Sequence, residues 1–179
     1  MIQDRGGLST LVTVMMFTIG LFLLGVGYYI IATEIPSPSY PTDKWEFLWF
    51  KYTEDLQDPW GKYIKKTQRT EWNFVEDYSD GEVADTGESE LVGFRASRTL
   101  RVSSRTRYRL VLGSDDGIRL FIYDSDFREV THITSGWIDR AYTEHSYERV
   151  LDEGEYKILL EWYENTDGAL FTFNITSIE

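Results

Sequence analysis

Cysteine is absent from all 179 residues of this chain, which rules out two kinds of site. No disulfide can form, and no thiolate is available to bind zinc or an iron–sulfur cluster. Histidine is scarce as well: His132, in a predicted strand edge, and His145, in a predicted polar loop, have no serine or metal-ligand partner at a meaningful spacing. A glycine-rich phosphate loop between a strand and a helix is also missing. The sequence therefore predicts a protein that binds and is not an enzyme.

Basic residues are outnumbered, because 18 Lys and Arg face 30 Asp and Glu and leave a net charge of −12. This balance argues against nucleic acid as a partner and against docking on anionic lipid headgroups. Acidic residues gather between Glu76 and Glu90, but their spacing does not match an EF-hand loop. We interpret that segment as a solvated loop.

Charged residues are missing from one long segment, the apolar run from Leu8 to Ala32. At about 1.5 Å per residue, a helix of this length crosses a hydrocarbon core of roughly 30 Å. A cleaved signal peptide would be shorter and would end in small residues, whereas this run ends in Tyr28 and Tyr29, which suit a membrane interface. We predict that residues 1–33 form a retained transmembrane helix in contact with membrane lipid. Arg5 indicates, by the positive-inside rule, a single-pass protein of the cell membrane whose domain lies at the cell surface.

Small residues recur every seven positions in this helix, at Gly6, Thr13, Gly20 and Gly27. They lie near one stripe, and such a stripe lets a second helix approach closely. The stripe predicts a helix partner, from the same or another subunit, although glycine is also simply common in membrane helices. The string that begins at Arg5 also resembles the start of archaeal pilins and archaellins, whose apolar helices pack in a filament core. That resemblance implies an alternative function, a structural subunit of a surface filament or of a membrane complex.

Residues 34–42 hold three of the four prolines and are predicted to form an extended spacer before a domain at 43–179. The domain shows the alternation of β-strands with turn signals between them, which predicts an all-β antiparallel β-sandwich. The predicted strands include residues 91–95, 100–102, 108–112, 118–123, 156–163 and 170–175. Only residues 64–69 hint at a helix.

Aromatic residues crowd the start of this domain, at Trp45, Phe47, Trp49, Phe50, Tyr52 and Trp60. We predict that most of them fill the core, because large rings dominate core packing. Any that stay exposed would form a patch for a partner.

The segment LGSDDGIRLFI at 112–122 resembles the central signature of the PA-fourteen domain, named after anthrax protective antigen. Segments 151–158, 161–164 and 168–171 resemble the later strands and the closing turn of that domain, in the expected order. The resemblance covers most of the chain after the spacer. It implies an antiparallel β-sandwich that serves as a binding module in adhesins, toxins and cell-surface proteins.

The same resemblance points to a site at Asp115 and Asp116. In the yeast adhesins of the family, two consecutive aspartates hold a Ca²⁺ ion that coordinates sugar hydroxyls, and this pair matches them. Asn165 and Asp167, in the loop before the last predicted strand, are further candidate ligands.

Two interpretations of the aspartate pair stay open. Ca²⁺ takes several oxygen ligands, which a tight turn can bring together. Asp-Asp-Gly is also ordinary turn chemistry, predicted here for a hairpin, with no metal at all. The first hypothesis is therefore a membrane-anchored adhesion module that binds glycans with Ca²⁺, and the alternative is the structural subunit described above.

Overall fold

The computed structural model describes residues 43–53, 59–79, 81–134, 136–166 and 168–178. The predicted transmembrane helix at 1–33, its stripe of Gly6, Thr13, Gly20 and Gly27, and the spacer at 34–42 lie outside these residues. No helix within the described part of the chain is long and apolar enough to cross a membrane.

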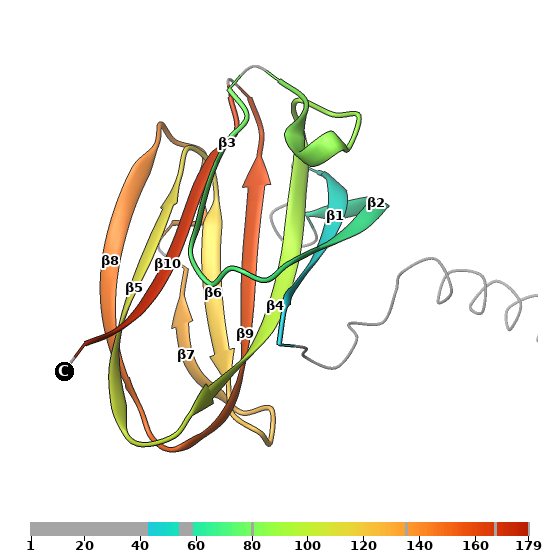
Figure 1. The fold of residues 1–179 in the computed structure, drawn as a ribbon. Helices are drawn as coiled ribbons and strands as arrows, with labels where there is room; N and C mark the ends of the chain where they lie inside the picture. Colours follow the sequence, from blue (N-terminus) through green and yellow to red (C-terminus); the bar gives the residue numbers. More distant parts are fainter. Residues whose placement is uncertain (1–42, 54–58, 80, 135, 167, 179) are drawn as a thin grey trace, which may run out of the picture. The chain divides into compact units, whose positions relative to one another are not determined.

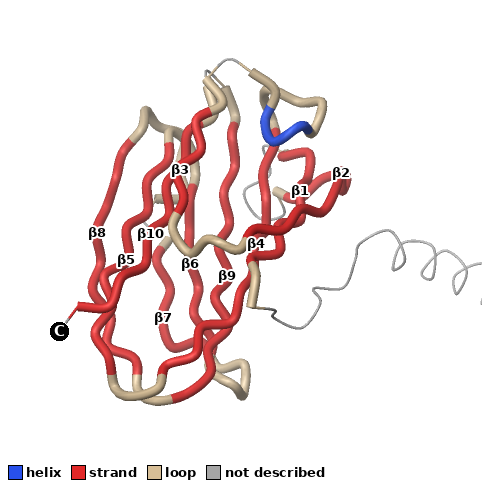
Figure 2. Tube along the Cα trace, viewed as in Figure 1, coloured by secondary structure: helices blue, strands red, loops and turns tan. Residues whose placement is uncertain are grey.

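The described residues form ten strands and one short 3₁₀ helix, as Figure 1 and Figure 2 show. The strands are β1 (Trp45–Tyr52), β2 (Trp60–Arg69), β3 (Phe74–Asp77), β4 (Val92–Val102), β5 (Thr106–Ser114), β6 (Ile118–Tyr123), β7 (Glu129–Ile133), β8 (Thr143–Leu151), β9 (Gly154–Glu164) and β10 (Leu170–Ile178). The 3₁₀ helix, η1 (Val83–Asp85), lies between β3 and β4.

These strands make two sheets with only antiparallel pairs. The six-stranded sheet has the order β2-β1-β4-β9-β6-β7, and the four-stranded sheet has the order β3-β10-β5-β8. The two sheets form the layers seen in Figure 1 and enclose one apolar core between them. The predicted antiparallel β-sandwich is confirmed, because alternate residues of each strand face the opposite sheet.

Aromatic rings fill the centre of the core. Phe94 is fully buried, and its ring centroid lies 4.9 Å from that of Phe47, 5.0 Å from that of Phe171 and 5.6 Å from that of Trp162. Aromatic pairs at such separations stabilise a core beyond the burial of their area. The prediction that the aromatic start of the domain fills the core is confirmed for the inward side of β1, but Trp60 stays half-exposed.

The helix suggested for residues 64–69 is wrong. These residues belong to β2, which pairs along its length with β1, from Trp45 opposite Arg69 to Tyr52 opposite Trp60. Pairing with a neighbouring strand overrides the weak local preference of a polar, lysine-rich segment for a helix.

The two short strands predicted at 91–95 and 100–102 are one strand, β4. Polar residues between them, such as Ser97 and Thr99, do not interrupt pairing, because β4 is in register with β9 from Val92 opposite Glu164 to Val102 opposite Gly154. Similarly, the acidic segment predicted as a loop begins inside β3, and His145 lies in β8, not in a loop. In each case pairing with a neighbouring strand extends the β-structure beyond its apolar residues.

Candidate functional site

The turn from Ser114 to Gly117 connects the two sheets at one end of the sandwich. It joins β5, which pairs with β10 and β8, to β6, which pairs with β9 and β7. The predicted hairpin is therefore wrong, since the strands on either side of the turn do not pair with each other. Turn chemistry determines that the chain reverses, but it does not determine which sheet the next strand joins.

Gly117 allows another strand to come very close to this turn. A Cβ atom at this position would lie 1.8 Å from a ring carbon of Tyr163, so a larger residue would collide with the ring. The backbone N–H of Tyr163 donates to the carbonyl of Gly117 at 2.9 Å. The Tyr163 ring also stacks on Tyr52, with centroids 4.1 Å apart, and its hydroxyl donates to Asp139 at 2.6 Å. Glycine thus places the end of β9 directly against the turn.

Asp116 ties the turn to two other loops through backbone donors. Its side chain is only 6% exposed. Its Oδ1 accepts from the N–H of Arg140, in the β7–β8 loop, at 3.2 Å, and its Oδ2 accepts from the N–H of Asn165, in the β9–β10 loop, at 2.7 Å. One buried side chain thus accepts hydrogen bonds from the backbone of both loops and holds them in place.

Asp115 makes the equivalent connection to β10. Both of its carboxylate oxygens lie 3.0 Å from the backbone N–H of Leu170. Burial raises the pKa of Asp115, while the Leu170 N–H and a hydrogen bond with Glu164 act in the opposite direction. The structure therefore brings Asp115 and Asp116 together with the loop that the sequence analysis singled out.

Glu164, the last residue of β9, completes a cluster of three carboxyl groups. It is fully buried, and no N–H or hydroxyl group of the described residues donates to either of its oxygens. Its carboxyl group is in contact with those of Asp115 and Asp116. Burial, followed by repulsion from these two carboxylates, raises the pKa of Glu164 to about 10. Glu164 is therefore protonated at neutral pH, and its O–H group can donate a hydrogen bond to the neighbouring aspartate carboxylates.

Sequence reasoning missed Glu164, although a signal was present. The alternation in β9 places Tyr156, Ile158, Leu160 and Trp162 on the inward face, and Glu164 is the next residue of that series. A carboxyl group at an inward position is costly unless it is neutral or paired, so it marks a site worth examining.

The sequence analysis named two further candidate ligands, Asn165 and Asp167. Asn165 gives its backbone N–H to Asp116, but its side-chain Nδ2 donates to Asp139 Oδ2 at 3.1 Å. Asp139, which the sequence analysis did not consider, thereby connects Asn165 and Tyr163. Asp167 lies outside the described residues.

The three carboxyl groups are oxygen ligands of the kind that a hard cation prefers, although they do not enclose a metal site. No three His, Cys, Asp or Glu side chains in the described part of the chain are already arranged to hold a metal ion. The two oxygens of Glu164 nevertheless lack a donor and lie beside two more carboxylates. Carboxylate oxygens are the ligands that Ca²⁺ prefers. Asp115, Asp116 and Glu164 thus supply the type of oxygen ligand that Ca²⁺ prefers, although they are not arranged as a formed metal site.

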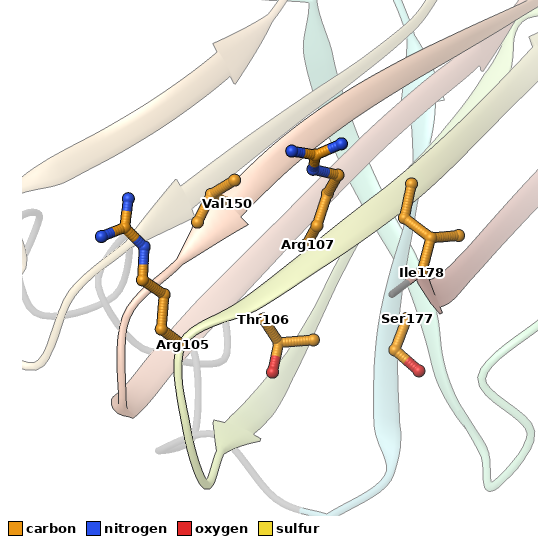
Figure 3. A pocket seen from close by; sticks show the side chains of 6 residues that line it. All are labelled: Arg105, Thr106, Arg107, Val150, Ser177 and Ile178. Atoms are coloured by element: carbon orange, nitrogen blue, oxygen red, sulfur yellow. The ribbon is translucent and has the colours of Figure 1, made fainter.

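A large hollow lies at the other end of β5, away from this cluster. Its volume is about 610 Å³, and Figure 3 shows its lining residues, Arg105, Thr106, Arg107, Val150, Ser177 and Ile178. No carboxyl group lines it, so it lacks the carboxylate ligands that the cluster at the other end of β5 offers.

No protein-family model and no curated protein matches this sequence, but solved structures do. The PA14 domain of the MpAFP antifreeze protein is 9% identical, with a TM-score of 0.55 over 80% of this chain and 88% of that chain. The A domain of epithelial adhesin 9 from Candida glabrata, in complex with Galβ1-3GlcNAc, is 14% identical, with a TM-score of 0.50 over 79% of this chain and 87% of that chain. The fold is PA14-like. The PA-fourteen resemblance of the sequence is confirmed at the level of the fold.

Larger proteins contain the same PA14-like fold as one part. An anti-sigma factor domain-containing protein from Clostridium clariflavum is 15% identical, with a TM-score of 0.54, and this chain covers 48% of its length. A β-glucosidase from Kluyveromyces marxianus, 10% identical with a TM-score of 0.50, is matched over 16% of its length. This chain thus spans half or less of these proteins. Among the matches that extend over most of both chains are an adhesin domain and an antifreeze-protein domain.

Proposed function

We propose that this PA14-like domain binds glycans at the Asp115–Asp116 turn with the help of Ca²⁺. The observation that carries the proposal is the buried carboxyl group of Glu164, which has no hydrogen-bond donor and lies against both aspartates. The fold supports it, since a structurally similar adhesin domain has been solved with a galactosyl disaccharide. A third, buried carboxyl group beside the two aspartates exceeds what a simple turn requires.

Each residue has a distinct part in this proposal. Asp115, Asp116 and Glu164 would hold Ca²⁺, and bound Ca²⁺ supplies open positions for two neighbouring sugar hydroxyls. Backbone N–H groups of Leu170, Asn165 and Arg140 fix the aspartate side chains before any ligand arrives. Glu164 must give up its proton when the cation binds, because the proton and the cation occupy the same group of oxygens.

Titration calorimetry on the full-length chain tests the cation step. We expect heat on addition of Ca²⁺, release of about one proton per ion at pH 7, and a higher melting temperature, since Ca²⁺ binds only the folded form. The D115N/D116N double variant should lose all three effects and keep the β fold, because asparagine retains turn bonding. D152N, an exposed aspartate in the turn between β8 and β9, is the matched control. If Ca²⁺ gives no heat and leaves the melting temperature unchanged, the pair is a turn only.

A second measurement tests the glycan step. Lactose and Galβ1-3GlcNAc are suitable probes, because a structurally similar domain has been solved with each. We expect binding in the presence of Ca²⁺ that is lost in EDTA and in the double variant. Equal glycan binding in EDTA would show that Ca²⁺ is not required and would contradict this part of the proposal.

We further propose that the helix at 1–33 anchors the domain at the outer surface of the cell membrane. Its support is the uncharged run from Leu8 to Ala32 with Arg5 before it. Protease added to intact cells should then remove residues 43–179. Cleavage that occurs only after permeabilisation would contradict this orientation.

A further inference from the structure

The outer face of the six-stranded sheet carries an unusual group of charges. Arg95 on β4 lies directly opposite Glu161 on β9, and Glu161 lies directly opposite Arg119 on β6. Each side chain points away from the core, since its neighbours in the strand, such as Phe94 and Trp162, are buried inward. The register of three strands thus places one carboxylate between two guanidinium groups.

The geometry of this group leaves donors free. Glu161 is 3% exposed, and its two oxygens accept from Nε of Arg95 at 2.7 Å and from Nε of Arg119 at 2.6 Å. Both arginines use Nε for this contact, and their terminal N–H₂ groups have no ion-pair partner among the described residues. A guanidinium group held in this way presents a planar pair of donors that suits a carboxylate or a sulfate.

Lys157 adds a third cation to the same face. It is half-buried on β9, opposite Tyr123 of β6, and it has no ion-pair or hydrogen-bond partner among the described residues. Burial, followed by the charge of Arg95, lowers the pKa of Lys157. Asp124 and Glu155 line the same hollow as Lys157, but each is paired with an arginine, Arg128 and Arg101 respectively. Arg95, Arg119 and Lys157 therefore have only Glu161 as a carboxylate of their own, in a chain whose net charge is −12.

Aromatic rings border these cations. The guanidinium carbon of Arg119 lies 3.8 Å from the ring centroid of Trp137, and that of Arg95 lies 6.0 Å from the ring centroid of Trp60. Phe121 and Tyr123 follow Arg119 on the outer side of β6, with stacked rings and centroids 6.3 Å apart. All four rings are partly exposed. Partly exposed rings present an apolar surface on which the C–H face of a ligand can pack.

We propose that this face, made of Arg95, Arg119, Lys157 and the rings of Trp60, Trp137, Phe121 and Tyr123, binds an acidic saccharide. The C–H face of a sugar ring packs on the aromatic side chains, and its carboxylate or sulfate pairs with the free guanidinium and ammonium groups. A long polyanion such as nucleic acid is disfavoured, since the acidic remainder of the domain repels it. The face shares no residue with the Asp115–Asp116 site and needs no metal ion, so it is independent of the function proposed above.

Calorimetry on the full-length chain in EDTA tests this inference, with trigalacturonic acid as the acidic probe and maltotriose as the neutral one. We expect trigalacturonic acid to bind and maltotriose not to bind. Binding should weaken as salt is added, because the contacts are ionic. Trp60 and Trp137 should report the contact as a change in tryptophan fluorescence.

Three variants locate the site. K157Q removes an unpaired cation without breaking any contact of the described residues, and we expect about tenfold weaker binding, as the loss of one charge-assisted hydrogen bond implies. R119K keeps the charge beside Glu161 but loses the stacking on Trp137, and we expect about fivefold weaker binding. R107Q, an exposed arginine of the other sheet seen in Figure 3, is the control and should change affinity less than about twofold, the scale of exposed charges. Melting temperatures verify that each variant folds.

Several outcomes would overturn the inference. If maltotriose binds as tightly as trigalacturonic acid, charge does not determine binding. If K157Q and R107Q weaken binding equally, the saccharide does not bind at this face. If a hexaglutamate peptide or a decathymidine oligonucleotide binds more tightly than trigalacturonic acid, the saccharide assignment fails and the face belongs to that class of ligand. Absence of binding to trigalacturonic acid at millimolar concentration would also refute it.

Discussion

Replacing Glu164 by glutamine should change how the stability of this domain depends on pH. The folded state raises the pKa of Glu164 from 4.5 to about 10, so between these values the folded chain holds a proton that the unfolded chain releases. Stability therefore falls as pH rises, because the unfolded state binds fewer protons. The contribution is fully present below pH 4.5 and is lost as the pH rises through about 10. Glutamine cannot ionise, and its N–H₂ group can donate to the same aspartates as the proton did.

The size of the effect follows from the same linkage. One bound proton changes the free energy of unfolding by about 1.4 kcal/mol per pH unit. From pH 6 to pH 8, the wild-type protein should lose about 3 kcal/mol relative to E164Q. Glu164 is fully buried, so solvent does not screen this contribution. Burial also raises the pKa of Asp115, but that residue is present in both proteins.

Urea unfolding, followed by tryptophan fluorescence at pH 6, 7 and 8, measures this difference. The wild-type and E164Q curves should move apart steadily with pH, with E164Q gaining relative stability. E153Q, which changes an exposed glutamate in the turn between β8 and β9, is the control and should follow the wild type. Parallel curves for wild type and E164Q across this range would refute the claim that Glu164 is protonated in the folded state.

Further substitutions test the packing and the anchor. G117A should destabilise the domain by about 2–4 kcal/mol in urea unfolding, because the new Cβ would meet the Tyr163 ring at 1.8 Å. The same change in a Y163A background should cost much less, and an equal cost would contradict the proposed collision. F94A should cost about 3–5 kcal/mol through the cavity left in the core, and a loss below about 1 kcal/mol would show that the core collapses around it. G20L should reduce the native size of the detergent-solubilised chain if the helix packs against a partner. An unchanged size would leave the helix as a simple tether.

The sequence predicts the β-sandwich well, because strand alternation and turn signals are patterns within short segments. Alternation in segments such as 118–123 and 156–163 identifies which residues face the core, and a turn signal needs only four residues. What alternation cannot give is the partner of each strand. It therefore failed to show that the turn at Ser114–Gly117 crosses between sheets and that β2 pairs with β1.

The candidate site was predictable only in part, for a related reason. Asp115 and Asp116 belong to a recognisable turn, whereas Glu164 lies about fifty residues further along and joins them only when β9 reaches the same end of the sandwich. The backbone donors of Arg140 and Leu170 have no sequence signature, because every residue except proline has an N–H group. Even so, the inward position of Glu164 at the end of an apolar series was visible in the sequence.

The contacts of Asp115 and Asp116 also affect how such a domain can change over time. Both side chains hold the two loops and the start of β10 by main-chain N–H groups, at Arg140, Asn165 and Leu170, and not by the side chains of those residues. A substitution in the loops, other than to proline, therefore leaves these hydrogen bonds available. The surface that meets a ligand can diversify in sequence while its scaffold stays fixed, so one framework can acquire new specificities without being rebuilt.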